Sequence, residues 1–259
     1  MLSKADIKEI RALGQKKFRD ERGLFVVEGE KLVEEAFRSG FEIVRHFRVE
    51  EIGEETMARI SQLTHPSPAL AVIRRPAPVV PVIAPDELVL ALDGIRDPGN
   101  LGTILRIADW FGIRQILASD DTVEVYNPKV VQATMGAIFR VRVHYCHLKS
   151  EVERVVFRDA SIFSASGTKS QSATERPAMA VYGTFLEGDN IFETPLTPGG
   201  IVVMGSEANG ISPEVASIVT RKLFIPPFPP DAHTSESLNV AVATAITCAE
   251  FRRRQGLFL

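Results

Sequence analysis

The sequence predicts an α/β protein of two domains, a small α/β domain followed by a larger domain with a mostly parallel sheet. Short apolar runs alternate with amphipathic segments along the whole chain, which is typical of folds whose helices cover a sheet. A stretch at 74–87 holds four prolines in fourteen residues, and proline both stiffens a chain and is excluded from central strands. At 259 residues the chain exceeds one typical domain. We therefore expect domains at 1–75 and 88–259, joined by a linker at 76–87.

The first domain is expected to alternate strands and helices. Residues 3–18 place Ile7, Ile10, Leu13 and Phe18 near helical spacing and predict an amphipathic helix. The β-α-β-α-β order of the segments that follow makes a small α/β domain complete in itself. Those segments are a strand at 24–27, a helix at 31–38 closed by Gly40, a strand at 41–49, a helix at 54–63 and a strand at 69–74.

The second domain begins with a continuously apolar strand at 88–92, as expected of a parallel strand covered on both faces. Asn127 and Pro128 occupy the cap and first-turn positions of a helix at 127–135, and Ser212 caps a helix near Pro213. The other predicted elements are a helix at 103–111, strands at 115–118, 139–143, 161–164, 178–182, 201–204 and 223–225, and a long apolar helix after residue 239.

Composition narrows the class of protein. The sequence is 45% hydrophobic and 24% charged, has no apolar run of about 20 residues and shows no signal-peptide pattern, so we expect a soluble cytoplasmic protein without membrane contact. Cys146 and Cys248 lie too far apart for a CxxC site, and no His/Cys/Asp cluster predicts a metal. The net charge of −3 gives no global attraction for nucleic acid, but residues 1–22 carry seven Lys or Arg against four acids. Either a solvated helix face or a phosphate-binding surface explains that run.

Polar and small residues follow three of the predicted strands, where open α/β folds place their ligands. After the strand at 88–92, residues 97–99 form a turn, Asn100 is placed to cap the next helix, and Arg106 follows nearly two turns later. By pattern alone Asn100 could be only a cap and Arg106 only a surface arginine. The pattern therefore predicts a ligand site at the ends of these strands.

The other two loops lie in the second half of the predicted domain. The segment GSEANG at 205–210 follows the strand at 201–204, its two glycines allow a close backbone approach, and Glu207 stands beside the strand end. Ser237 is placed to cap the last helix, which puts Asn239 in the first turn, an unfavourable position without a partner. That helix is so apolar that it must be buried or packed against another subunit.

The segments PGNLGTILRIA, VMGSEANGIS and SLNVAVATAI resemble, in order and spacing, the three signature motifs of the SpoU (TrmH-like) branch of the SPOUT RNA methyltransferases. GLFVVEGEKLVEEAF is similar to the substrate-binding domain of ribosomal RNA ribose methyltransferases in this family, a domain that resembles ribosomal protein L30e. The resemblance implies methyl transfer from S-adenosylmethionine to a ribose 2′-hydroxyl, most simply in 23S ribosomal RNA. It also implies a C-terminal trefoil knot and a homodimer formed through the C-terminal domain.

The resemblance also implies roles for individual residues. The backbones of Gly205 and Ile225, together with Leu238, would hold the cofactor, and the catalytic cluster would consist of Asn100, Arg106, Glu207, Ser237 and Asn239. The pKa of an arginine lies above about 12, so an electrostatic role at the developing alkoxide suits Arg106 better than that of a general base. Glu207 and Asn100 would hold its guanidinium, while Ser237 and Asn239 order their loop. Beside an RNA-binding domain, the basic N-terminal segment is interpreted as phosphate contacts from Lys16, Lys17, Arg19 and Arg22.

The same residues bear on other classes of function. A dinucleotide-binding Rossmann enzyme is disfavoured because no G-x-G-x-x-G follows the first strand of either domain. Transfer RNA as substrate and a catalytically silent RNA-binding protein stay open, although all five cluster residues are present. The segment 226–236 is longer and richer in proline than is usual in the family, which puts ligand roles there, including that of His233, in doubt. The sequence identifies neither the methylated nucleotide nor the role of 165–182.

Overall fold

The fold is given by a computed structural model, which describes residues 2–157, 179–229 and 235–256. The chain divides into two compact units, the first comprising 1–79, 97–109 and 123–142 and the second comprising 80–96, 110–122 and 143–259. The division after residue 79 falls within the proline-rich stretch, but two segments of the predicted second domain group with the first unit. The boundaries 1–75 and 88–259 therefore stay a prediction. The predicted strand at 161–164 and the loop residue His233 lie outside the described residues.

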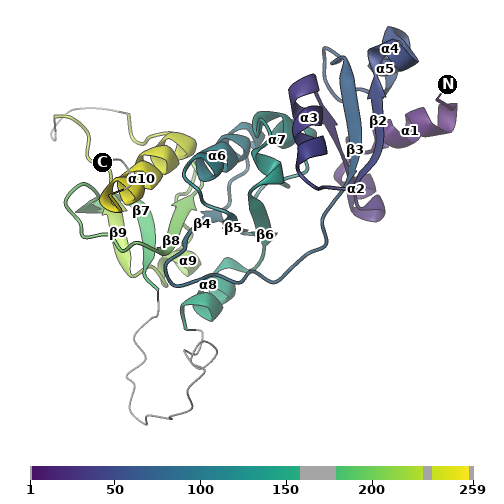
Figure 1. The fold of residues 1–259 in the computed structure, drawn as a ribbon. Helices are drawn as coiled ribbons and strands as arrows, with labels where there is room; N and C mark the ends of the chain where they lie inside the picture. Colours follow the sequence, from purple (N-terminus) through teal and green to yellow (C-terminus); the bar gives the residue numbers. More distant parts are fainter. Residues whose placement is uncertain (1, 158–178, 230–234, 257–259) are drawn as a thin grey trace, which may run out of the picture. The chain divides into compact units, whose positions relative to one another are not determined.

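The first unit is built on a three-stranded antiparallel sheet in the order β1-β3-β2 (Figure 1). The predicted alternation of strands and helices in residues 24–74 is confirmed. The elements of this unit are α1 (Lys4–Ala12), α2 (Lys16–Arg22), β1 (Leu24–Glu28), α3 (Glu30–Arg38), β2 (Ile43–Arg48), α4 (Val49–Ile52), α5 (Glu54–Ile60), β3 (Ala69–Arg74), α6 (Pro98–Trp110), α7 (Pro128–Ala133) and the 3-10 turn η1 (Ala137–Phe139).

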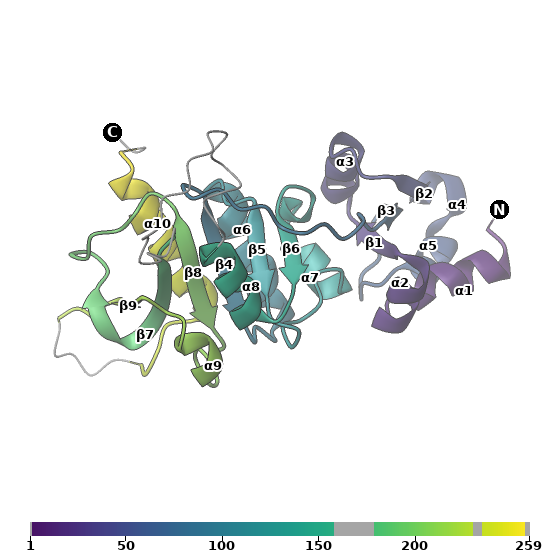
Figure 2. The same ribbon diagram turned by 90° about the horizontal axis from the view of Figure 1, so that it is seen from below.

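Strand alternation separates the two faces of this sheet. Leu70 and Val72 of β3 pack in one apolar cluster with residues of α1 and α5, such as Ile10 and Met57. Helix α3 lies over the opposite face of the sheet (Figures 1 and 2). Because every residue of β3 from Ala69 to Ile73 is buried, this strand is the centre of the unit.

The single helix predicted at 3–18 is wrong, because the structure has two helices with a break at residues 13–15. Ser3 caps α1 with a capping box in which Asp6 takes part. The side-chain amide of Gln62 donates to the carbonyls of Ile10 and Arg11, each at 3.2 Å. These bonds provide partners for two carbonyl groups at the C-terminal end of α1. This long-range cap has no signal in the local periodicity.

The second unit contains a six-stranded sheet in the order β6-β5-β4-β8-β7-β9. The pairs β4–β5, β4–β8, β7–β8 and β7–β9 are parallel, which confirms the predicted parallel sheet. Its elements are β4 (Leu88–Asp93), β5 (Gln115–Ala118), β6 (Arg142–Tyr145), α8 (Leu148–Val156), β7 (Val181–Asn190), β8 (Gly200–Gly205), α9 (Pro213–Ala216), β9 (Arg221–Phe224) and α10 (Val240–Arg254).

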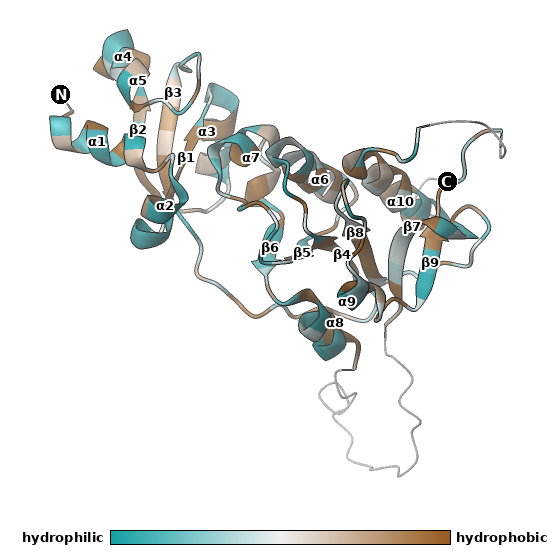
Figure 3. Cartoon of the chain, turned by 180° about the vertical axis from the view of Figure 1, so that it is seen from behind, coloured by the Kyte–Doolittle hydropathy of each residue, from teal (hydrophilic) through white to brown (hydrophobic). Residues whose placement is uncertain are grey.

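Helices cover both faces of the second sheet. On one face, Val152 of α8 and Val215 of α9 pack against Val89 and Val203 of the central strands. On the other face, Phe251 of α10 makes an edge-to-face ring contact with Tyr182 of β7, at 5.0 Å between ring centroids. Figure 3 shows the apolar character of β4 and β8, the strands buried between these layers.

Some predicted elements moved by a few residues. Helix α6 begins at Pro98 rather than at 103, and the strand predicted at 139–143 is η1 followed by β6 from Arg142. The weak strand predicted at 178–182 is the long strand β7 from Val181. The caps at Asn127 and Ser212 are confirmed by their side chains, which accept hydrogen bonds from backbone amides at the start of α7 and α9.

Candidate active site

The glycine loop follows β8 and closes on itself. The amide of Ser206 donates to the carbonyl of Gly210 at 3.1 Å, and the amide of Gly210 donates back to Ser206 at 2.9 Å. A Cβ at Gly205 would lie 2.1 Å from the carbonyl carbon of Gly210, so only glycine permits this closure. Glu207 is exposed at the outer turn of the loop. The loop is thus a preformed turn at the carboxyl end of β8.

Asp93 holds the far end of that loop. It is the last residue of β4, it is buried, and its Oδ2 accepts a hydrogen bond from the amide of Ser212 at 2.7 Å. Asp93 lies opposite Gly205 in the parallel register of β4 and β8. The sequence motif at 93–106 begins at Asp93 but predicts no role for it, although an acid directly after a continuously apolar strand is a local signal for a polar strand end.

A second polar cluster closes the carboxyl edge next to β5. The hydroxyl of Ser119 donates to Asp121 at 2.7 Å and accepts from the amide of Gly94 at 2.8 Å. The hydrogen bond from Ser119, followed by that from Arg96 at 3.1 Å, lowers the pKa of Asp121 from its usual value. The carboxyl ends of β5, β4 and β8 are therefore joined by polar contacts into one rigid edge.

The loop after β9 leads into α10. Ile225 follows the last residue of β9 and is half-buried, and Leu238 is exposed just before the helix. Asn239 is the N-cap of α10, because its Oδ1 accepts from the amides of Ala241 at 2.9 Å and Val242 at 3.3 Å. The expectation that Ser237 caps this helix, with Asn239 inside the first turn, is wrong.

Asn100 and Arg106 both lie on α6, in the first unit. Asn100 does not cap this helix as expected, because α6 already begins at Pro98 and the amide of Asn100 donates to Asp97 Oδ1 at 2.8 Å. Arg106 is exposed. The predicted catalytic cluster is divided between the units, since Glu207, Ser237 and Asn239 belong to the second.

The basic residues predicted to contact RNA are paired with carboxylates. Lys16 bonds to Asp20 at 2.6 Å and Lys17 approaches Glu21 at 3.9 Å, both within α2, with side chains 64% and 75% exposed. Arg22 is less exposed and lies 2.5 Å from Glu9. Exposed ion pairs of this kind are weak, so Lys16 and Lys17 can exchange a carboxylate for a phosphate.

Arg19 corrects the prediction for this segment, because its side chain is only 2% exposed. Its Nε and Nη2 both donate to Glu124 Oε2, at 3.1 and 2.6 Å, and its Nη1 donates to the carbonyl of Leu13 at 2.9 Å. All of its contacts lie within the first unit. A buried guanidinium with these partners serves the fold and is not an RNA contact.

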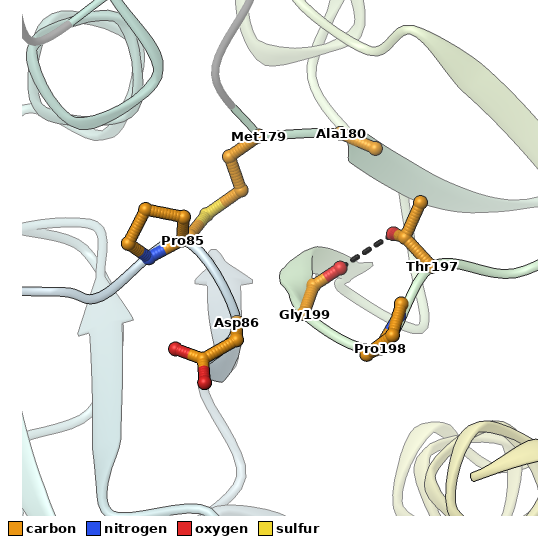
Figure 4. Close-up of a pocket in the computed structure, with 7 residues that line it drawn as sticks. All are labelled: Pro85, Asp86, Met179, Ala180, Thr197, Pro198 and Gly199. Carbon is orange, nitrogen blue, oxygen red and sulfur yellow. Dashed lines mark hydrogen bonds between the residues drawn. The ribbon is translucent and has the colours of Figure 1, made fainter. Parts of the chain in front are cut away.

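A cavity of about 250 Å³ lies at the opposite, amino edge of the second sheet (Figure 4). It is lined by Pro85, Asp86, Met179, Ala180, Thr197, Pro198 and Gly199, which precede β4, β7 and β8. None of the predicted site residues lines it. Within the described ranges no three His, Cys, Asp or Glu side chains gather as a metal site, and no helix is long and apolar enough to span a membrane.

Comparison with known proteins identifies the family. Residues 87–249 match the model of the SpoU rRNA Methylase family, and residues 4–69 match the MRM3-like substrate binding domain. The 23S rRNA (guanosine(2553)-2′-O)-methyltransferase RlmP of Bacillus subtilis is 28% identical over 263 residues, which cover 95% of each chain.

Solved structures agree over nearly the whole chain. A TrmH-family protein from Porphyromonas gingivalis has a TM-score of 0.82 at 38% identity, covering 98% of this chain and 99% of its own. An AdoMet-bound rRNA methyltransferase from Sinorhizobium meliloti has a TM-score of 0.79 at 28% identity, covering 98% and 97%. The α/β fold with its parallel sheet is the fold that this chain shares with these methyltransferase structures. The chain belongs to the SpoU rRNA methylase family, and it is an enzyme.

Proposed function

We propose that this protein transfers a methyl group from S-adenosylmethionine to a ribose 2′-hydroxyl of 23S ribosomal RNA. The observation that carries the proposal is the family match over 87–249, which includes the loops at the ends of β4, β8 and β9. The printed activity of RlmP, a relative aligned over 95% of both chains, supports the ribose hydroxyl and the 23S substrate.

The residues at the carboxyl edge fit the cofactor. Gly205 ends β8 at a turn fixed by its own hydrogen bonds, Ile225 follows β9, and Leu238 offers an exposed apolar side chain that a purine ring can cover. These are the residues that would hold S-adenosylmethionine. When bound, it would supply a sulfonium methyl group to the ribose oxygen; the hydroxyl proton would pass to solvent and a neutral thioether would remain.

Arg106 is proposed to stabilise the negative charge that develops on the ribose oxygen. Its guanidinium stays charged at neutral pH and presents several donors, which suits an alkoxide and the neighbouring RNA phosphate. Burial of the two thiols raises the pKa of Cys146 to about 11 and that of Cys248 to about 12, so neither offers a thiolate at neutral pH. The roles of Asn100 and Glu207 as partners of Arg106 stay predictions.

Asn239 is proposed to order the loop before α10 rather than to touch the reacting atoms. Its Oδ1 accepts hydrogen bonds from two amides at the start of α10. Asn239 therefore fixes the position of the backbone that carries Ser237 and Leu238. Removal of an N-cap typically costs about 0.5–2 kcal/mol. Its loss is therefore expected to weaken cofactor binding more than the chemical step.

RNA is proposed to contact the first unit through Lys16, Lys17 and, with less exposure, Arg22. The match of residues 4–69 to a substrate-binding domain supports this assignment. These contacts would position the RNA on its phosphates without reading its sequence.

A homodimer through the C-terminal domain is proposed from exposed apolar side chains near α10. Trp110 and Val242 are exposed, and Arg252 of α10 donates to the carbonyl of Phe111 at 2.8 Å. Light scattering at micromolar concentration should give a dimer, and Val242→Glu should give a monomer. The trefoil knot and the L30e-like character of the first unit stay predictions.

The test is methyl transfer from labelled S-adenosylmethionine to total RNA from cells that lack this protein. Wild type, Arg106→Ala and the matched control Arg142→Ala, an exposed arginine outside the motifs, would be compared. A 2′-O-methyl group blocks alkaline cleavage of the following phosphodiester, so the label should appear in an alkali-resistant dinucleotide from 23S RNA. Arg106→Ala should lose at least about 100-fold in rate while binding the cofactor normally.

Other outcomes identify the alternatives. Label in transfer RNA would reassign the substrate and keep the reaction. Cofactor binding without label in any RNA, including RNA in ribosome assembly intermediates, would favour a catalytically silent RNA-binding protein. Label in an alkali-labile nucleotide would place the methyl group on a base and reject the ribose assignment.

A further inference from the structure

We propose that an exposed face formed by Phe37, His46 and Arg48 binds an unpaired nucleotide of the substrate RNA, with its base stacked on the Phe37–His46 ring pair. We call this the Phe37 face. The proposal rests on the proposed function, because it describes how the first unit holds the RNA that the enzyme methylates.

The two rings come from neighbouring elements. Phe37 lies in the last turn of α3, and His46 lies on β2, an edge strand of the sheet (Figure 2). Their ring centroids are 5.4 Å apart with an interplanar angle of 79°. Phe37 is 54% exposed and His46 is exposed as well, so the pair offers ring surface to solvent.

The fold of the unit does not require Phe37 in this position. Leu32, Val33 and Ala36 supply the buried face of α3. Single exposed apolar residues are common on protein surfaces, but Phe37 is held against a second ring and lies on the unit that matches a substrate-binding domain. An immobilised pair of exposed rings is a suitable stacking surface for a nucleobase.

Charge on this face favours RNA over a neutral ligand. Arg48 follows His46 by two residues on β2, and alternation along a strand places both side chains on the same side of the sheet. Lys31 and Arg38 are exposed on α3, to one side of the helix stripe of Phe37. That stripe also carries the exposed Glu30 and Glu34. Among the described residues no carboxylate lies within 4 Å of Lys31 or Arg48, whereas Arg38 pairs with Glu34 at 3.8 Å.

The same observations favour an unpaired nucleotide over a duplex. A base inside an A-form helix keeps both faces stacked on its neighbours and is not available to a protein ring. Sequence-tolerant stacking on an aromatic side chain contributes about 1–3 kcal/mol per base. The Phe37 face therefore fits a loop or bulge whose base is turned out and whose phosphate reaches Arg48.

The experiment measures RNA affinity of the full chain without cofactor, by fluorescence anisotropy with single-stranded oligo(U) and oligo(A) of about eight nucleotides and a duplex of equal length. Phe37→Ala should weaken single-strand binding by roughly 5- to 150-fold, and Phe37→Tyr should retain it within about twofold. Phe157→Ala removes a comparably exposed ring, 57% exposed in the second unit, and should change nothing. Arg48→Ala should lower the salt slope of single-strand binding by about 0.7.

Melting temperatures of all variants would first show that they fold, and His46→Ala provides a second variant of the same face. Wild-type affinity in both Phe37→Ala and His46→Ala would overturn the proposal, even if the enzyme methylates RNA. Equal loss of duplex and single-strand affinity would also overturn it. If wild type methylates no RNA but Phe37→Ala still loses single-strand affinity, the proposed reaction fails and the Phe37 face stands.

Discussion

Helix α2 and the loop after β8 differ in where their partners come from. The loop closes through Ser206 and Gly210, four residues apart, and is anchored by the neighbouring strand at Asp93. The cations of α2 instead depend on carboxylates that include Glu124, 105 residues further along the chain from Arg19. The geometry of a loop at a strand end can be predicted from the local sequence. The role of a charged side chain instead depends on the partners that the fold places beside it.

The sharpest test of this difference is Arg19→Ala. Removing one partner of a buried pair leaves Glu124 without its cation, and breaking such a pair typically costs about 3–5 kcal/mol. We expect a loss of that order in the free energy of unfolding in urea, with little effect on the salt dependence of RNA binding. Lys17→Ala, a cation of the same helix with an exposed side chain, should lose less than about 0.5 kcal/mol. A stable Arg19→Ala variant with weakened RNA binding would reverse our correction.

Gly205→Ala tests the local side of the comparison. The added Cβ would lie 2.1 Å from the carbonyl carbon of Gly210 and 2.3 Å from the nitrogen of Ile211, so the loop must open. Overpacking of this kind costs about 1–3 kcal/mol, and we expect the affinity for S-adenosylmethionine to fall by roughly 10- to 100-fold in calorimetry.

Gly210→Ala is the matched control for this variant. Gly210 has a φ of +65° but open space around its Cβ position, so alanine there carries only backbone strain of about 1–2 kcal/mol. Cofactor affinity should fall less than in Gly205→Ala. Equal losses in the two variants would show that loop closure is not what the cofactor needs.

The same contrast explains how much could be predicted from the sequence. The continuously apolar strand at 88–92 and the glycines after 201–204 gave the parallel sheet and its polar edge, because strand burial and strand ends leave local patterns. The predicted cap of the last helix, Ser237, lies two residues before the observed cap, Asn239, since both are good cap residues and local sequence does not choose between them.

Hydrogen-bond partners that lie far apart in the sequence cannot be predicted from local patterns either. Gln62 caps α1 across 51 residues, and Asp93 holds Ser212 across 119 residues, and neither pairing has a local signal. The early start of α6 follows from Pro98 at its first position and from the amide of Asn100 donating to Asp97. The sequence pattern instead predicts Asn100 as the cap.

Substitution of Lys16 and Lys17 is expected to have a smaller effect. It tests whether these exposed cations of α2 differ in role from the buried Arg19. If both contact phosphates, the double variant Lys16→Ala/Lys17→Ala should reduce the slope of log affinity against log salt by about 1.8 for duplex RNA regions. Thermal stability should stay near that of wild type, since both pairs are exposed. Lys222→Ala, an exposed lysine of the second unit, is the control. An unchanged slope in the double variant would reject the phosphate contacts.

Substitution of Glu28 is expected to have the smallest effect. It tests whether the polar end of β1 stabilises the fold of the first unit or contacts RNA. Glu28 ends β1, is buried, and accepts hydrogen bonds from the Ser61 hydroxyl at 2.7 Å and the Gln62 amide at 2.5 Å. Burial nevertheless raises the pKa of Glu28 above its usual value of 4.5. The folded protein therefore holds this proton more tightly than the unfolded chain does.

A raised pKa in the folded state gives stability that is fully present below pH 4.5 and is lost as pH rises through the folded value. Unfolding in urea between about pH 4 and 8 should show the free energy of wild type, relative to Glu28→Gln, falling as pH rises and then levelling off. A difference that rises with pH would mean that the hydrogen bonds from Ser61 and Gln62 outweigh burial. RNA affinity should be the same in both proteins at neutral pH, because a buried carboxyl with two protein donors has no surface to offer a nucleotide. A selective loss of RNA affinity in Glu28→Gln would instead place this strand end in the RNA site.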